Sequence, residues 1–265
     1  MAEHCMGDTY IHGTEPSEQD RLAALNHLTN EAFVRFLGIV PEMRILEVGS
    51  GLGILAAEVA AAAEGVYVCG LEKAAEQIAA ATKTSNVTYV QGDAHKLDFP
   101  DASFDLVYAR YLLEHVSDPQ KVLTEMRRVV HSGGRVAVCE NDISLLRLDP
   151  PCPTFEDVWR AFQQYQKSLG GDALIGRRLY RLFCAAGFTR IELSARPEVH
   201  WHSSLGFPCW IQNLIGNIES ARHGLVNSGL CERVQIQKAI VELKEFSEKK
   251  EASSNFMWNR AIAIR

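Results

Sequence analysis

The sequence predicts an α/β protein with a doubly wound, mostly parallel sheet. Between Met43 and Glu140, short apolar runs alternate with longer stretches of helical periodicity. The first run ends in a glycine-rich turn, Gly49-Ser50-Gly51-Leu52-Gly53, and an Ala-rich helical pattern begins directly after it. Strands and helices in regular succession indicate parallel strands joined by helices. Ligands of such sheets bind beyond the carboxyl ends of the strands.

The first element is a helix from about Ser17, in which apolar residues recur every three or four positions until Gly38 and Pro41 end it. Strand–helix units follow. We expect strands at 43–48, 65–71, 87–91, 104–109 and 135–140. We expect helices at 52–63, at 74–83, and from Asp118-Pro119, which supply a cap and a first position, to Gly133-Gly134.

Two stretches interrupt this rhythm. Residues 142–175 contain three prolines and an amphipathic helix of about 154–168. Residues 202–250 are mainly helical, with breaks expected at Gly206-Phe207-Pro208 and from Gly224 to Gly229. A helix near 175–186 and strands near 188–195 and 256–264 restore the pattern around them.

Composition and charge narrow the function classes. A net charge of −6 and a pI near 5.9 argue against nucleic acid as a partner. No run of 18 apolar residues is present, so we expect no membrane span, and the N-terminus lacks the pattern of a signal peptide. The seven cysteines form no C-x-x-C pair, which favours reduced thiols and a cytoplasmic location.

The glycine-rich turn favours a nucleoside-containing cofactor. Glycine allows a ligand to approach the backbone, and the helix start offers free N–H groups. Glu47 precedes the turn, and Glu72 ends the next strand, where an acid can accept hydrogen bonds from both ribose hydroxyls. The run Gly51-x-Gly53-x-x-Ala56 loosely matches the dinucleotide fingerprint, although Ile54 stands where counting from Gly49 requires the third glycine. The turn alone therefore leaves a nicotinamide cofactor open.

An acid also follows the third strand, and another lies in the fourth. Gly92-Asp93-Ala94 ends the third strand, and its carboxylate can accept from an exocyclic amine such as that of adenine, although Asp is also common in turns. Lys73 either pairs with the neighbouring Glu72 or faces water. Asp105 lies near the start of the fourth strand, away from the ligand edge, and we expect it to be structural.

Five ordered motifs resemble those of the class I S-adenosylmethionine (SAM)-dependent methyltransferases, namely Glu47 to Gly53, Glu72, Gly92-Asp93-Ala94, Phe104 to Val107 and Leu113-Glu114-His115-Val116. Looser matches at 10–15, 18–22 and 175–177 resemble a small-molecule subgroup of type 11 or 25. The resemblance implies a seven-stranded Rossmann-like sheet of order 3-2-1-4-5-7-6. It also implies one domain over 1–265, with a lid helix over 1–40, a SAM-binding core over 41–141 and an acceptor-side cap from 142–175 and 202–250.

The resemblance also implies the cofactor contacts. Glu47 and the turn would hold the methionine part of SAM, Glu72 the ribose and Asp93 the adenine. Arg110 lies where the backbone of the fourth strand meets the SAM amino group. The full expected set is Tyr10, Gln19, Glu47, Gly49, Ser50, Gly51, Gly53, Glu72, Lys73, Gly92, Asp93, Ala94 and Arg110. Ser50 departs from the pattern, because Cys is frequent there.

The methyl group of a sulfonium is already electrophilic, so the protein must chiefly align the nucleophile and exclude water. A base is needed only when the nucleophile keeps its proton. The candidates are His115, whose imidazole titrates near neutral pH, and Glu140 and Asp142 at the end of the fifth strand. His115 can equally belong to a structural turn, and the two acids can cap a loop or pair with Arg177 or Arg178.

Two groups of aromatic residues can line an apolar pocket or belong to the core: Trp159, Phe162 and Tyr165, then Trp201, Phe207 and Trp210. His200 and His202 share one side of a strand, but this pair alone is weak evidence for a metal, and we expect none. The prediction is a methyltransferase for a small-molecule O, N, S or C nucleophile. An NAD(P)-dependent oxidoreductase and a SAM-binding regulator without catalysis are the alternatives, and a homodimer is left open.

Overall fold

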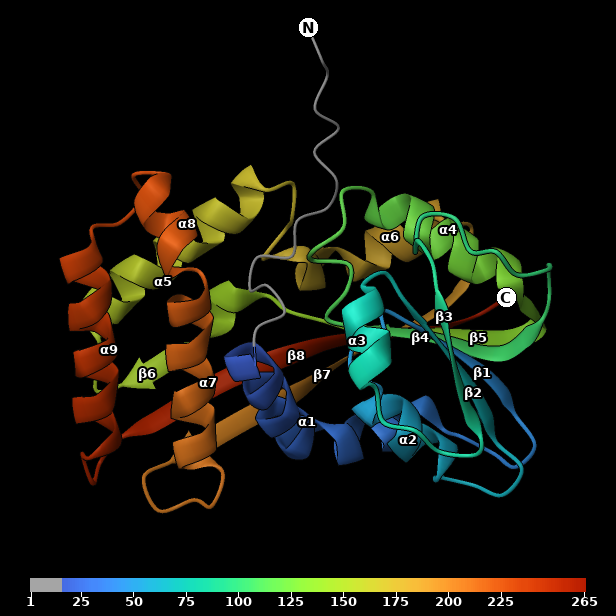
Figure 1. The fold of residues 1–265 in the computed structure, drawn as a ribbon, viewed down its shortest axis with the longest axis horizontal. Helices are drawn as coiled ribbons and strands as arrows, with labels where there is room; N and C mark the ends of the chain where they lie inside the picture. Colours follow the sequence, from blue (N-terminus) through green and yellow to red (C-terminus); the bar gives the residue numbers. More distant parts are fainter. Residues whose placement is uncertain (1–15) are drawn as a thin grey trace, which may run out of the picture.

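A computed structural model describes residues 16–265 of the chain. Its centre is an eight-stranded sheet in which β3, β2, β1, β4, β5, β8 and β6 follow one another, while β7 pairs with β8 (Figure 1). The strands are β1 (Arg44–Val48), β2 (Tyr67–Glu72), β3 (Val87–Gln91), β4 (Phe104–Arg110), β5 (Val130–Glu140), β6 (Arg147–Asp149), β7 (Arg190–Trp201) and β8 (Ser253–Ile264). The pairs among β1 to β5 are parallel, and β8 runs antiparallel to β5, β6 and β7.

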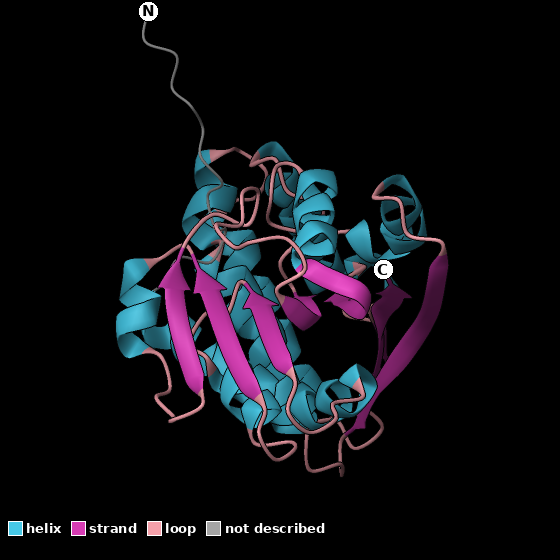
Figure 2. Cartoon of the chain, turned by 90° about the vertical axis from the view of Figure 1, so that its right-hand side faces the viewer, coloured by secondary structure: helices cyan, strands magenta, loops and turns pink. Residues whose placement is uncertain are grey.

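Helices surround this sheet, as the views in Figures 1 and 2 show. The α-helices are α1 (Pro16–Leu37), α2 (Ile54–Ala60), α3 (Ala75–Ala80), α4 (Pro119–Val129), α5 (Pro153–Ser168), α6 (Leu179–Ala185), α7 (Phe207–Ser220), α8 (Arg222–Asn227) and α9 (Arg233–Ser247). Two short 3-10 turns, η1 (Ile143–Leu145) and η2 (Ile175–Arg178), precede β6 and α6. Helices α1 and α2 lie on one face of the sheet, and α4 and α6 lie on the other.

The alternation of side chains along β1 divides the core between these two faces. Ile45 packs with the apolar residues of α1 and α2, whereas Leu46 and Val48 pack with those of α4 and α6. Helix α4 begins as its sequence predicts: Asp118 accepts a hydrogen bond from the backbone N–H of Lys121 at 2.9 Å, and proline follows the cap.

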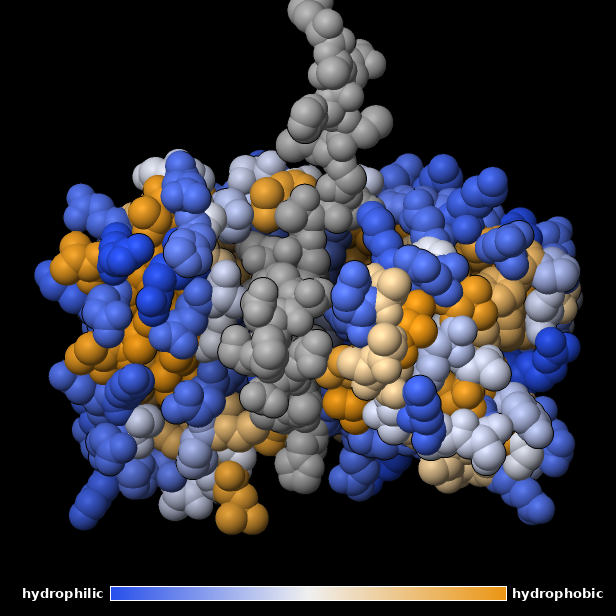
Figure 3. Space-filling model, viewed as in Figure 1, coloured by the Kyte–Doolittle hydropathy of each residue, from blue (hydrophilic) through white to orange (hydrophobic). Residues whose placement is uncertain are grey.

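A layer of helices lies beside the sheet where β8 and β6 meet. Helix α5 packs against α8 and α9, and α7 packs against both α9 and α1. Apolar side chains reach the surface between hydrophilic ones over α7 and α9 (Figure 3), and Val234 and Val241 of α9 are exposed. None of the described helices combines the length and the apolar character that a bilayer crossing requires.

The structure confirms the doubly wound α/β class and corrects its details. The described part has eight strands where seven were expected, because β6 adds three residues beside the start of β8. Strand β5 begins at Val130, so Gly133-Gly134 lies inside the strand, where the register with β4 shifts. Helix α8 runs through Gly224, where a break was expected.

Candidate active site

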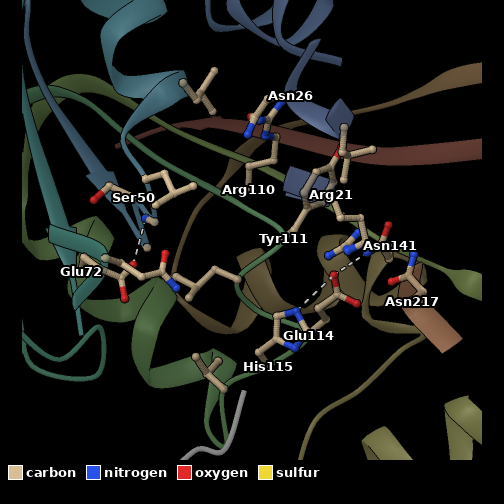
Figure 4. A pocket seen from close by; sticks show the side chains of 18 of the residues that line it. Arg21, Asn26, Ser50, Glu72, Arg110, Tyr111, Glu114, His115, Asn141 and Asn217 are labelled. Atoms are coloured by element: carbon tan, nitrogen blue, oxygen red, sulfur yellow. Dashed lines mark hydrogen bonds and ion pairs between the residues drawn. The ribbon is translucent and has the colours of Figure 1, made fainter. Parts of the chain in front are cut away.

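A cavity of about 410 Å³ opens at the carboxyl ends of β1, β2 and β4 (Figure 4). Its lining falls into two groups. The sheet side consists of Glu47, the turn 49–52, residues 72–74 and 92–95, and residues 110–112. The helix side consists of residues from α1, α5, α7, β8 and the loops after β4 and β5, including Arg21, Glu114, His115, Asn141, Trp159, Phe162, Gln166, Trp210, Asn213, Asn217, Phe256 and Trp258.

The glycine turn is held against β2 and needs its glycines. The backbone N–H groups of Gly49 and Ser50 both donate to the carbonyl of Leu71, at 2.8 and 3.0 Å. All three glycines of the turn have positive φ. A Cβ on Gly53 would lie 1.9 Å from the Tyr89 hydroxyl, so a side chain there would displace a neighbour as well as strain the backbone.

Glu72 joins the turn to the start of α3. Its carboxylate accepts hydrogen bonds from the backbone N–H of Gly51 at 2.9 Å, of Lys73 at 2.8 Å and of Ala74 at 2.9 Å. The side chain is half-buried and lines the cavity. A carboxylate has about four lone-pair sites, so Glu72 retains capacity for a ligand hydroxyl.

Glu47 is buried at the end of β1 and carries an unsatisfied oxygen. Its Oε2 has no hydrogen-bond partner among the described residues. Burial raises the pKa of Glu47 from 4.5 to about 8, against the opposing effects of the Arg110 guanidinium and the nearby Tyr108 hydroxyl. A cationic ligand group in the cavity would satisfy this oxygen and favour the carboxylate form.

Arg110 ties β4 to α1 beside Glu47. Its guanidinium donates to Thr29 at 3.1 Å, to Asn30 at 2.6 Å and to Asn26. It also lies over the ring of Tyr111, 5.2 Å from the centroid. These hydrogen bonds of the Arg110 guanidinium therefore all go to α1.

Asp93 is fixed by a residue that sequence reasoning passed over. His95 donates its backbone N–H to Asp93 Oδ1 at 2.9 Å, and its Nδ1 lies 2.8 Å from the same oxygen. Burial opposes ionisation, but the hydrogen bonds from His95 outweigh it and lower the pKa of Asp93. Lys73, Gly92, Asp93, Ala94 and His95 all line the cavity.

Two expected cofactor contacts have side chains that lie outside the described part of the chain. Tyr10 lies outside the described residues. Gln19 belongs to α1, but its side chain is also outside the described part. Their expected contacts with the cofactor therefore stay a prediction.

The two acids expected on the substrate side at the end of β5 are held elsewhere. Glu140 is fully buried and accepts from the backbone N–H groups of Leu112 at 3.0 Å and Leu113 at 2.8 Å. Asp142 is buried, with its Oδ2 2.6 Å from Arg177 Nε. Neither is among the described residues that line the cavity, whereas Asn141 between them is. The structure thus favours the alternative in which Glu140 caps a loop and Asp142 pairs with Arg177 over the one in which both acids face the acceptor.

Glu114 is the acid on the helix side, and the sequence analysis gave it no role. Asn141 Nδ2 donates to its Oε1, and Gln166 Nε2 lies 3.3 Å from its Oε2. His115 Nε2 is 3.8 Å from Oε1, so the carboxylate lies between His115 and Asn141 (Figure 4). Burial raises the pKa of Glu114 to about 7, although the hydrogen bonds from Gln166 and Asn141 oppose this rise.

Aromatic rings form the walls of the helix side. Trp159 and Phe162 of α5 stack with ring centroids 5.2 Å apart, and the ring centroids of Trp210 and Phe256 are 5.8 Å apart. The indole N–H of Trp159 donates to the carbonyl of Ile143 at 3.0 Å, and that of Trp210 to Ser254 Oγ at 2.7 Å. With the N–H groups satisfied inside the protein, these rings offer apolar surface to a ligand.

The other expected aromatic residues lie outside this lining. Phe207 is buried in the core, Tyr165 packs on the same core, and Trp201 is exposed on β7. His200 is buried and pairs with Glu198, its Nε2 lying 2.9 Å from Oε1. Within the described residues, no group of three or more His, Cys, Asp or Glu side chains is placed to hold a metal ion.

Comparison with known proteins agrees with this geometry. A family model described as "Methyltransferase domain" matches residues 46–138. The O-methyltransferase rstn1 of Aspergillus nomiae is 34% identical over 160 residues, covering 57% of this chain and 68% of that protein. The O-methyltransferase resE of Aspergillus sclerotiorum is 30% identical over 188 residues, covering 68% of this chain and 67% of that protein.

Solved structures show the same fold. A putative methyltransferase from an antibiotic biosynthesis pathway of Anabaena variabilis superposes with a TM-score of 0.62 at 19% identity, over 89% of this chain and 96% of that one. Together, the fold, the cavity and these relatives define the class: the chain belongs to the class I SAM-dependent methyltransferases. It is an enzyme of methyl transfer, and the relatives named above are methyltransferases rather than oxidoreductases.

Proposed function

We propose that the chain transfers the methyl group of SAM to a small-molecule acceptor and that donor and acceptor meet inside the cavity. The observation that carries this proposal is the buried oxygen of Glu47 beside the glycine turn, which has no hydrogen-bond partner in the described part of the chain. A buried polar atom without a partner is costly, and the ammonium group of SAM is a suitable partner for it.

The sheet side fits the remaining parts of SAM. Glu72 and the backbone of the turn lie together, so a ribose can hydrogen-bond to the carboxylate while the glycines allow close approach. Asp93, held as a carboxylate by His95, can accept from the adenine amine. When bound, SAM supplies an electrophilic methyl group on a cationic sulfur.

The helix side is the proposed acceptor site. Helix α5 contributes Trp159, Phe162 and Gln166, and α7 contributes Trp210 and Asn213. We therefore propose the division of the chain as a SAM-binding core over 41–141 and an acceptor-side cap from 142–175 and 202–250. Apolar walls around the acceptor would exclude water and help to hold the nucleophile in line with the methyl group.

Calorimetric titration with S-adenosylhomocysteine, NAD⁺ and NADP⁺ tests the donor site. We expect S-adenosylhomocysteine to bind with one-to-one stoichiometry and neither nicotinamide to bind. Binding of a nicotinamide without S-adenosylhomocysteine would refute the proposal. Methyl transfer from SAM to a member of a broad acceptor panel would then eliminate the non-catalytic regulator.

A further inference from the structure

Most of the polar side chains that the structure describes on the helix side are uncharged. Five carboxamides of the described residues line it, from Asn26, Asn141, Gln166, Asn213 and Asn217. The cation present, Arg21, donates to Asn213 Oδ1 at 2.7 Å and acts electrostatically on Glu114. Carboxamides donate and accept hydrogen bonds without adding charge, so this lining suits neutral hydroxyl and carbonyl groups.

The aromatic residues on the helix side of the cavity indicate what skeleton carries the polar groups of the acceptor. Aromatic walls from Trp159, Phe162, Trp210 and Phe256 stand around these amides. Flat apolar rings stack well on such side chains. A charged amine or carboxylate would have to lose its water shell here, at a high cost unless it were fully paired.

Glu114 is placed to take a proton in this chamber. Its side chain is 4% exposed, and it lines the cavity with one oxygen held by Asn141 and the other by Gln166. These two donors fix the carboxylate in position and leave lone pairs for a further donor. We propose that the acceptor is a neutral, hydroxyl-bearing ring compound and that Glu114 accepts its hydroxyl proton during methyl transfer.

This proposal rests on the proposed function, and the step balances. The acceptor oxygen forms a bond to the methyl carbon while the bond from that carbon to sulfur breaks. Sulfur keeps the electron pair and becomes a neutral thioether. The hydroxyl proton passes to the Glu114 carboxylate, so the positive charge of the sulfonium and the negative charge of the carboxylate disappear together.

The surroundings of Glu114 set its pH dependence. Among the described residues, the charged or titratable groups around it include Arg21 from α1, His115 beside it, Glu140 of β5 and Asp172 before η2. Because burial raises the pKa of Glu114 to about 7, the carboxylate is the minor form below that pH. The rate of methyl transfer should therefore rise with pH through about 7.

Isosteric Glu114→Gln, assayed with SAM and two acceptors, tests the proposal. The first acceptor is 2-naphthol, and the second is a nitro-substituted naphthol whose hydroxyl is already ionised at the assay pH. We expect kcat for 2-naphthol to fall roughly 10²- to 10⁴-fold and kcat for the nitronaphthol to change little, because only the first needs a base. The rise of the rate near pH 7 should also disappear, while the Kd of S-adenosylhomocysteine stays that of wild type.

Three results would overturn the proposal. An equal loss for both naphthols would give Glu114 a structural role. If His115→Gln lost turnover of 2-naphthol selectively while Glu114→Gln retained it, His115 rather than Glu114 would accept the proton. Methylation of 2-naphthylamine or 2-naphthalenethiol but of neither naphthol would exclude the hydroxyl acceptor. Each of these results leaves the proposed function intact. The proposed function is tested separately, and it fails if the wild-type protein does not bind S-adenosylhomocysteine.

Discussion

Replacement of Glu72 by alanine should weaken donor binding far more than it weakens the fold. The carboxylate accepts three backbone hydrogen bonds, from Gly51, Lys73 and Ala74. It is half-buried, so water can replace these bonds when the side chain is removed. A ribose hydroxyl inside the cavity has no such substitute.

The magnitude follows from these contacts. A hydrogen bond to a charged group contributes about 1.5 to 3 kcal/mol, so loss of the ribose contact should raise the Kd of S-adenosylhomocysteine roughly 10- to 150-fold. Loosening of the turn at Gly51 would add to this effect. Glu72→Gln keeps an acceptor oxygen without the charge and should give an intermediate Kd.

Isothermal titration calorimetry measures the affinity, and thermal unfolding checks the fold. Glu76→Ala is the matched control, because Glu76 is an exposed acid in the first turn of α3 and its replacement removes the same charge as Glu72→Ala. The control should bind like wild type. An unchanged Kd in Glu72→Ala would refute the ribose assignment, and so would equal losses in the two alanine variants.

Three further predictions concern the surroundings of the site. Because the pKa of Glu47 in the folded chain, about 8, lies above its ordinary 4.5, the folded state holds a proton that the unfolded chain releases. The free energy of unfolding therefore falls as the pH rises from 4.5 to 8. Glu47→Gln should remove this pH dependence from the melting temperature of the ligand-free protein, and an unchanged pH dependence would contradict the prediction. Gly53→Ala, with φ of 67° and Tyr89 in the way, should cost about 1 to 2 kcal/mol of stability and weaken S-adenosylhomocysteine binding, whereas wild-type melting would show that the turn tolerates a side chain. Asp142→Asn breaks the pair with Arg177 and should lower the free energy of unfolding by about 1 to 3 kcal/mol with kcat near wild type; a selective fall in kcat would restore the acceptor role.

The strand–helix units of the core were predictable because their signals are local. The cap at Asp118, the period of α4 and the apolar runs of β1 to β4 lie within a few residues of one another. Features that depend on distant contacts were not predictable. Gly224 looked like a helix break, yet a Cβ there would lie 2.0 Å from the Tyr165 hydroxyl, so packing against α5 accounts for this glycine inside α8.

The candidate site shows the same division. The turn and Glu72 lie at the carboxyl ends of the first two strands of the parallel sheet, so their place together at the cavity could be expected. Glu114 could not be singled out in this way, because its partners Asn141 and Gln166 are 27 and 52 residues away in the sequence. Whether Glu140 and Asp142 face the acceptor stayed open because a strand end does not reveal which face a side chain takes, and here Asn141 takes the cavity face.

A crystal structure of the protein with S-adenosylhomocysteine would test the central claim most directly, namely that this cavity holds the methyl donor beside the acceptor. The account predicts the ribose hydroxyls within hydrogen-bond distance of Glu72, the amino group at Glu47, and the thioether sulfur facing the helix side that carries Glu114. A ligand bound away from the glycine turn, or one whose sulfur faces away from the helix side, would contradict it.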